Sequence, residues 1–328
     1  MTVTCSQISF VSEGQVCRGS WYEPAQASGA CVVMAHGLGG LRTAGLAPYA
    51  QRFAEAGLAV LLFDYRHFGS SDGLPRQRVS VHRQLADWSA AVACARAQPG
   101  VAEDRVVLWG TSFSGGHVIV TAARDGRVAA VSAQCPMVDG LAASWNIVRY
   151  AGARQLLRLA GRGLRDLGRA ARGAPRLGVP LVGAPGTLAL MTTPDAEPGY
   201  RAIVGPDWVN SVCASFALGL AFYRPVSLAQ RLRCPALMIV ADDSVAPASA
   251  AVRAAQRIGS RCELHQWPQG HFDLYVGAAF DRGVALQLDF FSRVLALAPA
   301  ARPGPAGDRA VKTSVAAAPA EVAQVAQA

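Results

Sequence analysis

The fold of this chain is decided by one short stretch, Val106-Val107-Leu108-Trp109-Gly110-Thr111-Ser112-Phe113-Ser114-Gly115-Gly116-His117. A β-branched and aromatic run ends in small residues, and a helix-compatible run, Val118 to Arg124, follows at once. This pattern predicts a sharp turn from a strand into a helix, with Ser112 at its tip, where a nucleophile elbow places its serine. Small residues must flank that serine, because such a turn holds it at an unfavourable φ/ψ. The usual Gly-x-Ser-x-Gly pattern is broken by Ser114, which is still small enough to fit.

Two other interpretations of this stretch stay open at this point. Ser112 can be an ordinary N-cap of the following helix, a position that favours serine. Ser114 can be the nucleophile instead, in a Ser-x-Ser-x-Gly register that ends at Gly116. It would then lie half a turn into the helix, where its hydroxyl is less exposed. The rest of the chain has to decide between these interpretations.

Strands and helices alternate around the elbow. The strands expected in a buried parallel sheet are the apolar runs at 30–35, 58–63, 105–109, 128–133, 236–241 and 262–267. Helical periodicity is expected at 46–56, 79–98, 248–258 and about 276–297. A short hairpin around Glu13-Gly14 precedes them. This order predicts an α/β fold with a mostly parallel, doubly wound sheet.

The alternation breaks between residues 141 and 232. This part is arginine-rich, then rich in proline and glycine, then aromatic. It is too long for a loop and too apolar to be disordered, so we expect a mostly helical insertion that caps a core made of 1–140 and 233–297. Residues 298–328 consist mainly of small residues and proline, and are expected to form a disordered tail.

The composition limits the class of protein. A hydrophobic content of 52% is ample for a large core, and no apolar run reaches the roughly 18 residues that a membrane span needs. The first residues do not resemble a signal peptide, so a cytoplasmic location is expected. Eight scattered cysteines without a CxxC pair are typical of small buried side chains in a reducing compartment, and no metal site is expected.

The net charge of +9 is concentrated in one segment. Between Arg149 and Arg176 eight arginines accompany a single acid, Asp166, which is a surplus of seven positive charges. The ordinary interpretation is the solvated face of a cap helix. The alternative is attraction of acidic partners such as the phosphates of coenzyme A or an acyl carrier protein. Nucleic-acid binding is disfavoured, because no recognition motif accompanies the charge.

Residues suited to activate a serine follow later strands. A serine nucleophile needs a base that takes its proton and an acid that orients the base. His271 and the pair Asp242-Asp243 each follow a predicted strand, at the edge where open α/β sheets place their ligand crevice. The chain order of serine, acid and histidine is that of one group of serine hydrolases, and it favours Ser112 over the alternatives.

A glycine-rich turn, His36-Gly37-Leu38-Gly39-Gly40, follows an earlier strand and suits an oxyanion hole. The donors expected there are the backbone N–H groups of Leu38 and Phe113. The histidines less suited to act as the base are His36, His67, His82, His117 and His265. Asp64 and Arg66 also follow a strand, and we expect them to form a structural ion pair at the Phe68-Gly69 turn.

Several motifs together resemble the α/β-hydrolase superfamily over about residues 7–297. They are HGLGG (36–40), FDYRHFGSSDGLPRQ (63–77), DW (87–88), WGTSFSGGH (109–117) and GHFDLY (270–275). They are similar to a branch of bacterial hydrolases and fungal polyketide transferases and, more distantly, to dienelactone-hydrolase-like and X-prolyl-peptidase-like enzymes. Such families carry the acid four residues before a proline, here Pro247, which favours Asp243 over Asp242. Some place it after the preceding core strand, which keeps Asp139 open.

The resemblance implies a serine hydrolase that cleaves a carboxylic ester or thioester through an acyl-enzyme on Ser112, with His271 as base and Asp243 as acid. No cofactor or metal is implied. Transfer of the acyl group to an alcohol or amine is one alternative, and a hydrolase fold used only for binding is another. The cap residues expected to line an acyl pocket are Trp145, Trp208, Phe216 and Tyr223.

Overall fold

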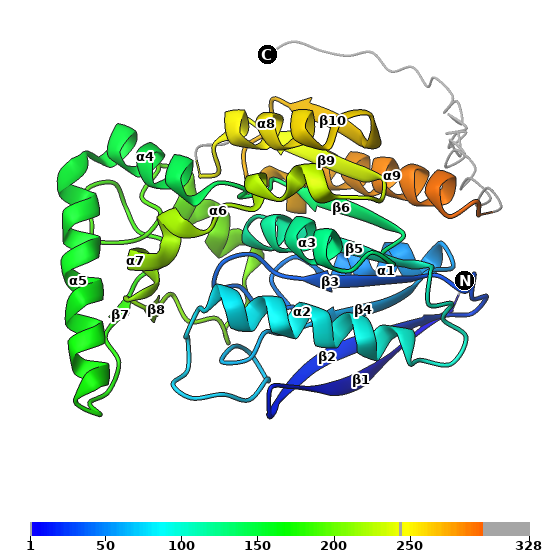
Figure 1. The fold of residues 1–328 in the computed structure, drawn as a ribbon, viewed down its shortest axis with the longest axis horizontal. Helices are drawn as coiled ribbons and strands as arrows, with labels where there is room; N and C mark the ends of the chain where they lie inside the picture. The colour runs from blue at the N-terminus through cyan, green and yellow to red at the C-terminus, as the bar shows by residue number, and fades with distance from the viewer. Residues whose placement is uncertain (1, 243–244, 298–328) are drawn as a thin grey trace, which may run out of the picture. The chain divides into compact units, whose positions relative to one another are not determined.

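Eight strands of the described chain form one sheet at the centre of the molecule (Figure 1). The computed structural model describes residues 2–242 and 245–297. The strand order is β1-β2-β4-β3-β5-β6-β9-β10; only the β1–β2 and β2–β4 pairs are antiparallel. The α/β class and the mostly parallel sheet are thereby confirmed. The strands are β1 (Val3–Ser12), β2 (Gln15–Pro24), β3 (Cys31–Ala35), β4 (Ala59–Phe63), β5 (Val106–Thr111), β6 (Ala130–Gln134), β9 (Ala236–Ala241) and β10 (Cys262–Trp267).

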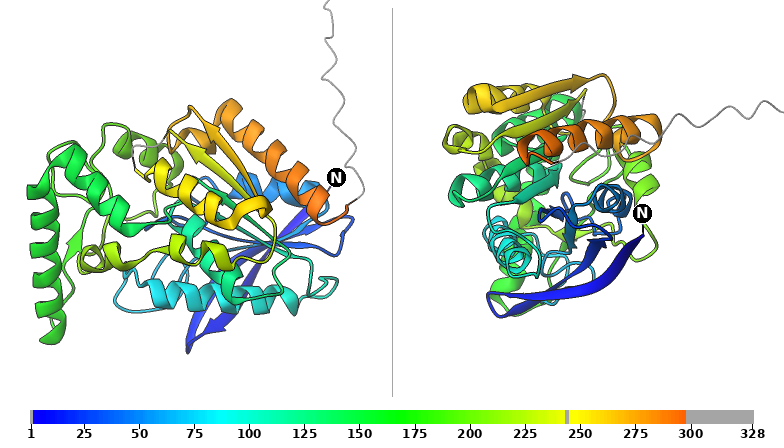
Figure 2. Two further views of the ribbon diagram at one scale, coloured as in Figure 1. Left: turned by 45° about the horizontal axis from the view of Figure 1, so that its top comes forward. Right: turned by 90° about the vertical axis from the view of Figure 1, so that its right-hand side faces the viewer.

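Helices cover both faces of this sheet (Figure 2). Every residue of β3, β4, β5, β6 and β9 is buried, because alternate side chains enter apolar clusters on opposite faces. One cluster includes residues of α1 (Ala47–Glu55) and α9 (Gly277–Val294). The other includes residues of α2 (Val81–Arg96), α3 (Phe113–Arg124) and α8 (Ala248–Ile258).

Residues 140–231, between β6 and β9, form what we call the inserted segment. Figure 1 shows much of it projecting to one side of the sheet, with α5 farthest out. It includes a two-stranded antiparallel pair, β7–β8, that we did not expect from the sequence. Its elements are α4 (Gly140–Ala151), α5 (Ala153–Ala171), β7 (Gly178–Val179), α6 (Ala196–Ile203), β8 (Val212–Cys213), α7 (Phe216–Gly219), η1 (Leu220–Phe222), η2 (Pro225–Ser227) and η3 (Ala229–Arg231). Two further 3-10 turns lie outside it, η4 (Gly259–Arg261) and η5 (Asp273–Tyr275).

Helix α5 is held to the rest of the inserted segment by its single acidic residue, Asp166. Asp166 is fully buried and accepts two hydrogen bonds from the Arg176 guanidinium, at 2.8 and 2.5 Å. It also accepts the backbone N–H groups of Leu177 and Ser215, at 2.8 and 2.9 Å. The arginines of this helix that are exposed to solvent are Arg154, Arg158, Arg165 and Arg169.

Two predictions fall outside the described residues: the acid Asp243 and the tail at 298–328. Within residues 2–242 and 245–297, no helix combines the length and apolar character needed to cross a membrane. The same residues contain no group of three or more His, Cys, Asp or Glu side chains that could hold a metal ion.

Candidate active site

Ser112 occupies a strained turn between β5 and α3. Its backbone lies at φ 55° and ψ −119°, a left-handed conformation that non-glycine residues rarely adopt. Its neighbours leave no room for side chains: a Cβ at Gly110 would overlap the carbonyl oxygen of Ser114, and one at Gly116 that of Met137. Ser112 is the N-cap residue of α3, yet its hydroxyl makes no capping hydrogen bond. This geometry is the strand–turn–helix that the sequence predicts, with the hydroxyl left for another role.

Ser114 has a structural place instead. Its side chain is fully buried, and its hydroxyl donates to the carbonyl oxygen of His36 at 2.5 Å. The hydroxyl of Tyr65 is its second hydrogen-bond partner. The residues lining the two cavities beside the elbow include Ser112 but not Ser114. The geometry therefore favours Ser112 as the reactive serine.

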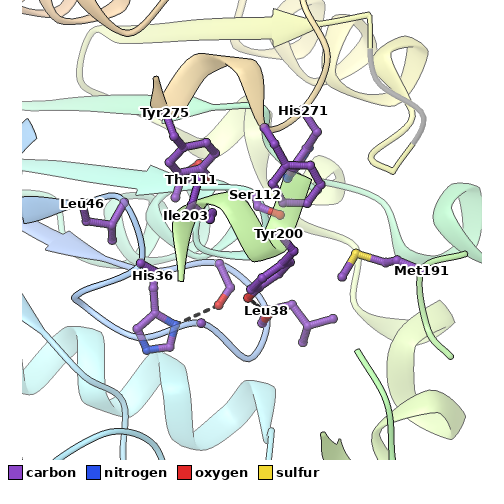
Figure 3. Close-up of a pocket in the computed structure, with 14 residues that line it drawn as sticks. His36, Leu38, Leu46, Thr111, Ser112, Met191, Tyr200, Ile203, His271 and Tyr275 are labelled. Atoms are coloured by element: carbon purple, nitrogen blue, oxygen red, sulfur yellow. Dashed lines mark hydrogen bonds between the residues drawn. The ribbon is translucent and has the colours of Figure 1, made fainter. Parts of the chain in front are cut away.

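Two cavities of the described chain meet at Ser112, and Leu38 also lines both. The first, shown in Figure 3, has a volume of about 390 Å³, which includes space open to solvent. Its lining includes His36, Gly37, Thr111, Tyr200, His271 and Tyr275. The second has a volume of about 530 Å³, measured in the same way, and is mostly apolar. Its lining includes Phe113, Met137, Ala143, Ile147, Leu190, Phe216 and Leu220.

His271 is brought to the first cavity by the loop that follows β10. It is 3% exposed and lines the same cavity as Ser112 (Figure 3). The N–H of Asp242 donates to the carbonyl oxygens of Trp267 and Gln269, at 2.9 and 3.0 Å, which ties the end of β9 to this loop. The end of β9, which the predicted acid follows in the sequence, is thus hydrogen-bonded to the loop that carries the predicted base.

Asp139, the alternative acid, is engaged elsewhere. It caps α4 by accepting the N–H groups of Leu141 and Ala142, and it pairs with Arg224 at 3.0 and 3.1 Å. Although burial opposes its charge, the Arg224 guanidinium and these N–H groups hold the pKa of Asp139 below its usual range. These contacts give Asp139 a structural role.

The glycine-rich turn lies directly against Ser112, since a Cβ at Gly37 would come within 2.9 Å of the Ser112 Cβ. The carbonyl oxygen of Gly37 accepts a hydrogen bond from Nδ1 of His36 at 2.8 Å. Nδ1 must therefore carry the proton, and burial lowers the pKa of His36, which keeps the ring neutral. Because a trans peptide points its N–H opposite to its C=O, this bond directs the N–H of Leu38 away from His36.

The four residues predicted to line the acyl pocket occupy different environments in the structure. Phe216 lines the second cavity. Tyr223 is buried and lines neither cavity; its hydroxyl lies 2.5 Å from Nδ1 of His117 and its ring 5.3 Å from that of Phe113. Trp208 donates its indole N–H to the carbonyl oxygen of Gly39 at 3.0 Å instead of lining either cavity.

Trp145 is a correction, because its side chain is 66% exposed and lines neither cavity. The buried face of α4 carries Ala143 and Ile147, and residue 145 points to the opposite side of the helix. The four-residue spacing of Ala143 and Ile147 was the signal that could have identified the lining face. Tyr200 and Tyr275, which also line the first cavity, carry no such sequence signal.

The expected ion pair between Asp64 and Arg66 is wrong. Asp64 pairs with Arg42 at 2.5 Å, while Arg66 turns towards the N-terminal hairpin and pairs with Asp87 and Glu13, at 2.6 and 2.8 Å. Both side chains are buried, so each is structural with partners of its own.

The sheet order, the strained serine after β5 and the buried histidine after β10 define an α/β-hydrolase enzyme. The chain belongs to the family described as Serine aminopeptidase, S33, whose model matches residues 26–275.

Similar proteins support this assignment. The chain is 42% identical over 292 residues to the quorum-quenching protein AidA of Acinetobacter baumannii (strain MDR-ZJ06), covering 88% of this chain and 94% of that protein. It is 37% identical over 137 residues to the thiohydrolase aneE of Aspergillus aculeatus, covering 42% and 43% of the two chains. The crystal structure of the α/β-hydrolase GrgF from Penicillium sp. sh18 has a TM-score of 0.78 at 24% identity, covering 89% of this chain and 99% of that one.

Proposed function

We propose that the protein is a serine hydrolase that cleaves a carboxylic ester or thioester through an acyl-enzyme on Ser112. One observation carries the proposal: Ser112 and Leu38 lie where the two cavities meet, and His271 lines one of them. A nucleophile, a base and a backbone donor thereby face a common space. We infer from the residue order that Asp243, outside the described residues, orients His271.

The chemistry follows from these roles. His271 accepts the Ser112 proton as Oγ attacks the acyl carbon, and the N–H groups of Leu38 and Phe113 stabilise the resulting oxyanion. The bond to the leaving oxygen or sulfur breaks, and His271 gives its proton to that atom. Water, deprotonated by His271, then attacks the acyl-enzyme, which releases the acid and restores Ser112.

The two cavities suggest which part of the substrate lies where. The second is almost wholly apolar and suits the acyl chain. The first adds the hydroxyls of Thr111 and Tyr275 to His271, and suits the leaving group and water. Helix α4 of the inserted segment supplies one wall of the second cavity, through Ala143 and Ile147. We therefore propose that the inserted segment acts as a cap.

Acyl transfer to an alcohol or amine is the second candidate. It is favoured by a relative named polyketide transferase grgF, from Penicillium sp, which is 35% identical over 139 residues. The relative AidA is named a quorum-quenching protein, so small signal molecules that contain an ester belong among the substrates to test. A cytoplasmic location and acyl-CoA or acyl-carrier-protein substrates remain predictions.

The test combines labelling with product analysis. The wild type should react with a fluorophosphonate probe and hydrolyse p-nitrophenyl butyrate and a butyryl thioester, whereas Ser112→Ala should do neither. Ser89→Ala, an exposed serine on α2 whose hydroxyl donates to the carbonyl oxygen of Leu85, is the control and should behave as wild type. A folded wild type that is neither labelled nor active would overturn the proposal. A product ester exceeding free acid, when an acceptor alcohol is added, would favour the transferase.

A further inference from the structure

We infer that Tyr200 and Trp208 of the inserted segment position the oxyanion turn of the core, residues 36–40. The inference rests on the proposed function, in which the N–H of Leu38 stabilises the oxyanion. Neither residue belongs to the proposed triad, and both are far from the turn in the sequence. They act as positioning residues, because they touch the backbone of the turn and not the reacting atoms.

Three successive carbonyl groups of the turn each accept a hydrogen bond from a ring. Gly37 accepts from Nδ1 of His36 at 2.8 Å, within the core. Leu38 accepts from the hydroxyl of Tyr200 at 2.7 Å, and Gly39 from the indole N–H of Trp208 at 3.0 Å. The inserted segment thus supplies two of the three donors.

The two donors from the inserted segment are held as a unit. The rings of Tyr200 and Trp208 are stacked, with centroids 4.8 Å apart and planes 21° from parallel. Tyr200 is 6% exposed, and burial raises the pKa of its phenol, so the hydroxyl stays protonated and able to donate. The turn fits closely against it, since a Cβ at Gly40 would lie 3.2 Å from the Tyr200 hydroxyl oxygen.

The same unit reaches the loop that carries the predicted base. The ring of Tyr200 lies 5.5 Å from that of Phe272, the residue after His271. Its neighbour on α6, Gly199, packs so closely that a Cβ there would lie 2.5 Å from Cδ2 of Phe272. Helix α6 therefore contacts both the oxyanion turn and the residue that follows His271. Figure 3 labels Tyr200 together with Leu38 and His271 around the first cavity.

This arrangement should affect the transition state more than substrate binding. An oxyanion donor contributes when it is already aimed at the position of the developing charge. The planar peptides of the turn are fixed at three carbonyls, which restricts rotation of the Gly37–Leu38 peptide. Binding of the acyl chain in the second cavity does not use these bonds, so their loss should lower kcat and leave KM nearly unchanged.

The test uses Tyr200→Phe, Trp208→Phe and the double variant, which keep an aromatic ring at each position, smaller at residue 208, and remove the donors. Losing an oxyanion donor outright costs roughly 100- to 1,000-fold, so loosening one should lower kcat of the double variant by about 5- to 50-fold. KM for a p-nitrophenyl ester should stay within about twofold. Affinity for a trifluoromethyl ketone, which mimics the tetrahedral intermediate, should fall in parallel with kcat/KM. Rates are expressed per titrated active site, which removes any effect of partial unfolding.

The controls are Tyr22→Phe and Trp21→Phe on β2, which line neither cavity and should leave kcat unchanged. Amide exchange of the peptide spanning 36–40 supplies a readout that needs no activity, and it should be faster in the double variant. If the wild type is active but exchange and kcat are unchanged, the positioning role is overturned. If exchange is faster while kcat per site is unchanged, its catalytic consequence is overturned. An inactive wild type overturns the proposed function itself, whatever the exchange shows.

Discussion

The hydroxyl of Ser114 donates to the carbonyl oxygen of His36 at 2.5 Å, so the second serine of the elbow supports the turn that faces the first. The bond belongs to a buried chain in which Trp88 donates to the Tyr65 hydroxyl at 2.7 Å, and Tyr65 contacts Ser114. A glycine at residue 114 would leave both the Tyr65 hydroxyl and the His36 carbonyl short of a partner. The departure from Gly-x-Ser-x-Gly therefore has a structural reason.

Ser114→Ala should consequently cost stability and spare reactivity. Removing a buried hydroxyl that has two partners is expected to lower the free energy of unfolding by about 1–3 kcal/mol. Urea denaturation measures this cost, and fluorophosphonate labelling of the folded variant should persist. The opposite pattern, labelling lost in Ser114→Ala and kept in Ser112→Ala, would mean that Ser114 is the nucleophile.

Acid should destabilise the protein through His117, which is fully buried in α3. Burial lowers its pKa to about 3, whereas an unfolded chain has a histidine pKa of about 6.5. As the pH falls below about 6.5 the unfolded state binds a proton that the folded state refuses, so stability decreases by up to about 1.4 kcal/mol per pH unit.

His117→Gln removes that titrating group. Its free energy of unfolding, measured by urea denaturation from pH 7.5 to 4, should fall less steeply than that of wild type, by up to about 1.4 kcal/mol per pH unit. Buried His36 and His67, whose pKa values burial also lowers, should leave a residual slope in both proteins. Parallel slopes for the two proteins would contradict a neutral, buried His117.

Asp166 should be the most sensitive acid of the inserted segment. Although burial opposes its charge, hydrogen bonds from Arg176, Ser215 and Leu177 hold the pKa of Asp166 well below its usual range. Asp166→Ala leaves the guanidinium of Arg176, 15% exposed, without its partner, and should lower the free energy of unfolding at pH 7 by about 3 kcal/mol.

The sign of the pH effect follows from the lowered pKa. The contribution of Asp166 is fully present above about pH 4 and declines at lower pH, where the unfolded state takes up a proton first. The difference between wild type and Asp166→Ala should therefore shrink below pH 4. Asp289→Ala, which breaks an exposed pair with Arg293, is the control and should cost less than about 1 kcal/mol. Equal losses in the two variants would contradict the structural role of Asp166.

The parts of the fold that the sequence predicts well are those that local pattern determines. The bounds of β9, β10 and α8 agree with the expected ranges, because each is a periodic or continuous apolar run between clear boundaries. The elbow could be predicted equally well, since only small residues tolerate its geometry.

The structure of the inserted segment could be predicted from the sequence only in outline. Which way Trp145 points depends on how α4 packs, and α4 uses alanine and isoleucine for its buried face. The ion-pair partners of Asp64 and Arg66 lie at residues 13, 42 and 87. These positions are far apart in the sequence, so a local pattern cannot show which of them pair. The contacts of Tyr200 and Trp208 with the oxyanion turn likewise join residues 162 and 169 positions apart in the chain.

The length of acyl chain that the second cavity accepts should be set by Ala143. This residue is 8% exposed and lines the cavity from the inner face of α4. Ala143→Leu adds bulk to a packed wall, which typically costs about 1–3 kcal/mol when the space is occupied. We expect kcat/KM for octanoyl and decanoyl p-nitrophenyl esters to fall about 5- to 100-fold, and that for the acetyl ester to change little.

Trp145→Ala, on the exposed face of the same helix, is the matched control for this experiment. It should leave the chain-length profile as in wild type, because the indole is 66% exposed and lines neither cavity. A profile that shifts with Trp145→Ala but not with Ala143→Leu would place the acyl chain outside the second cavity. Since Ser112→Ala abolishes turnover independently of chain length in the proposed mechanism, that result would revise the acyl site while leaving the nucleophile in place.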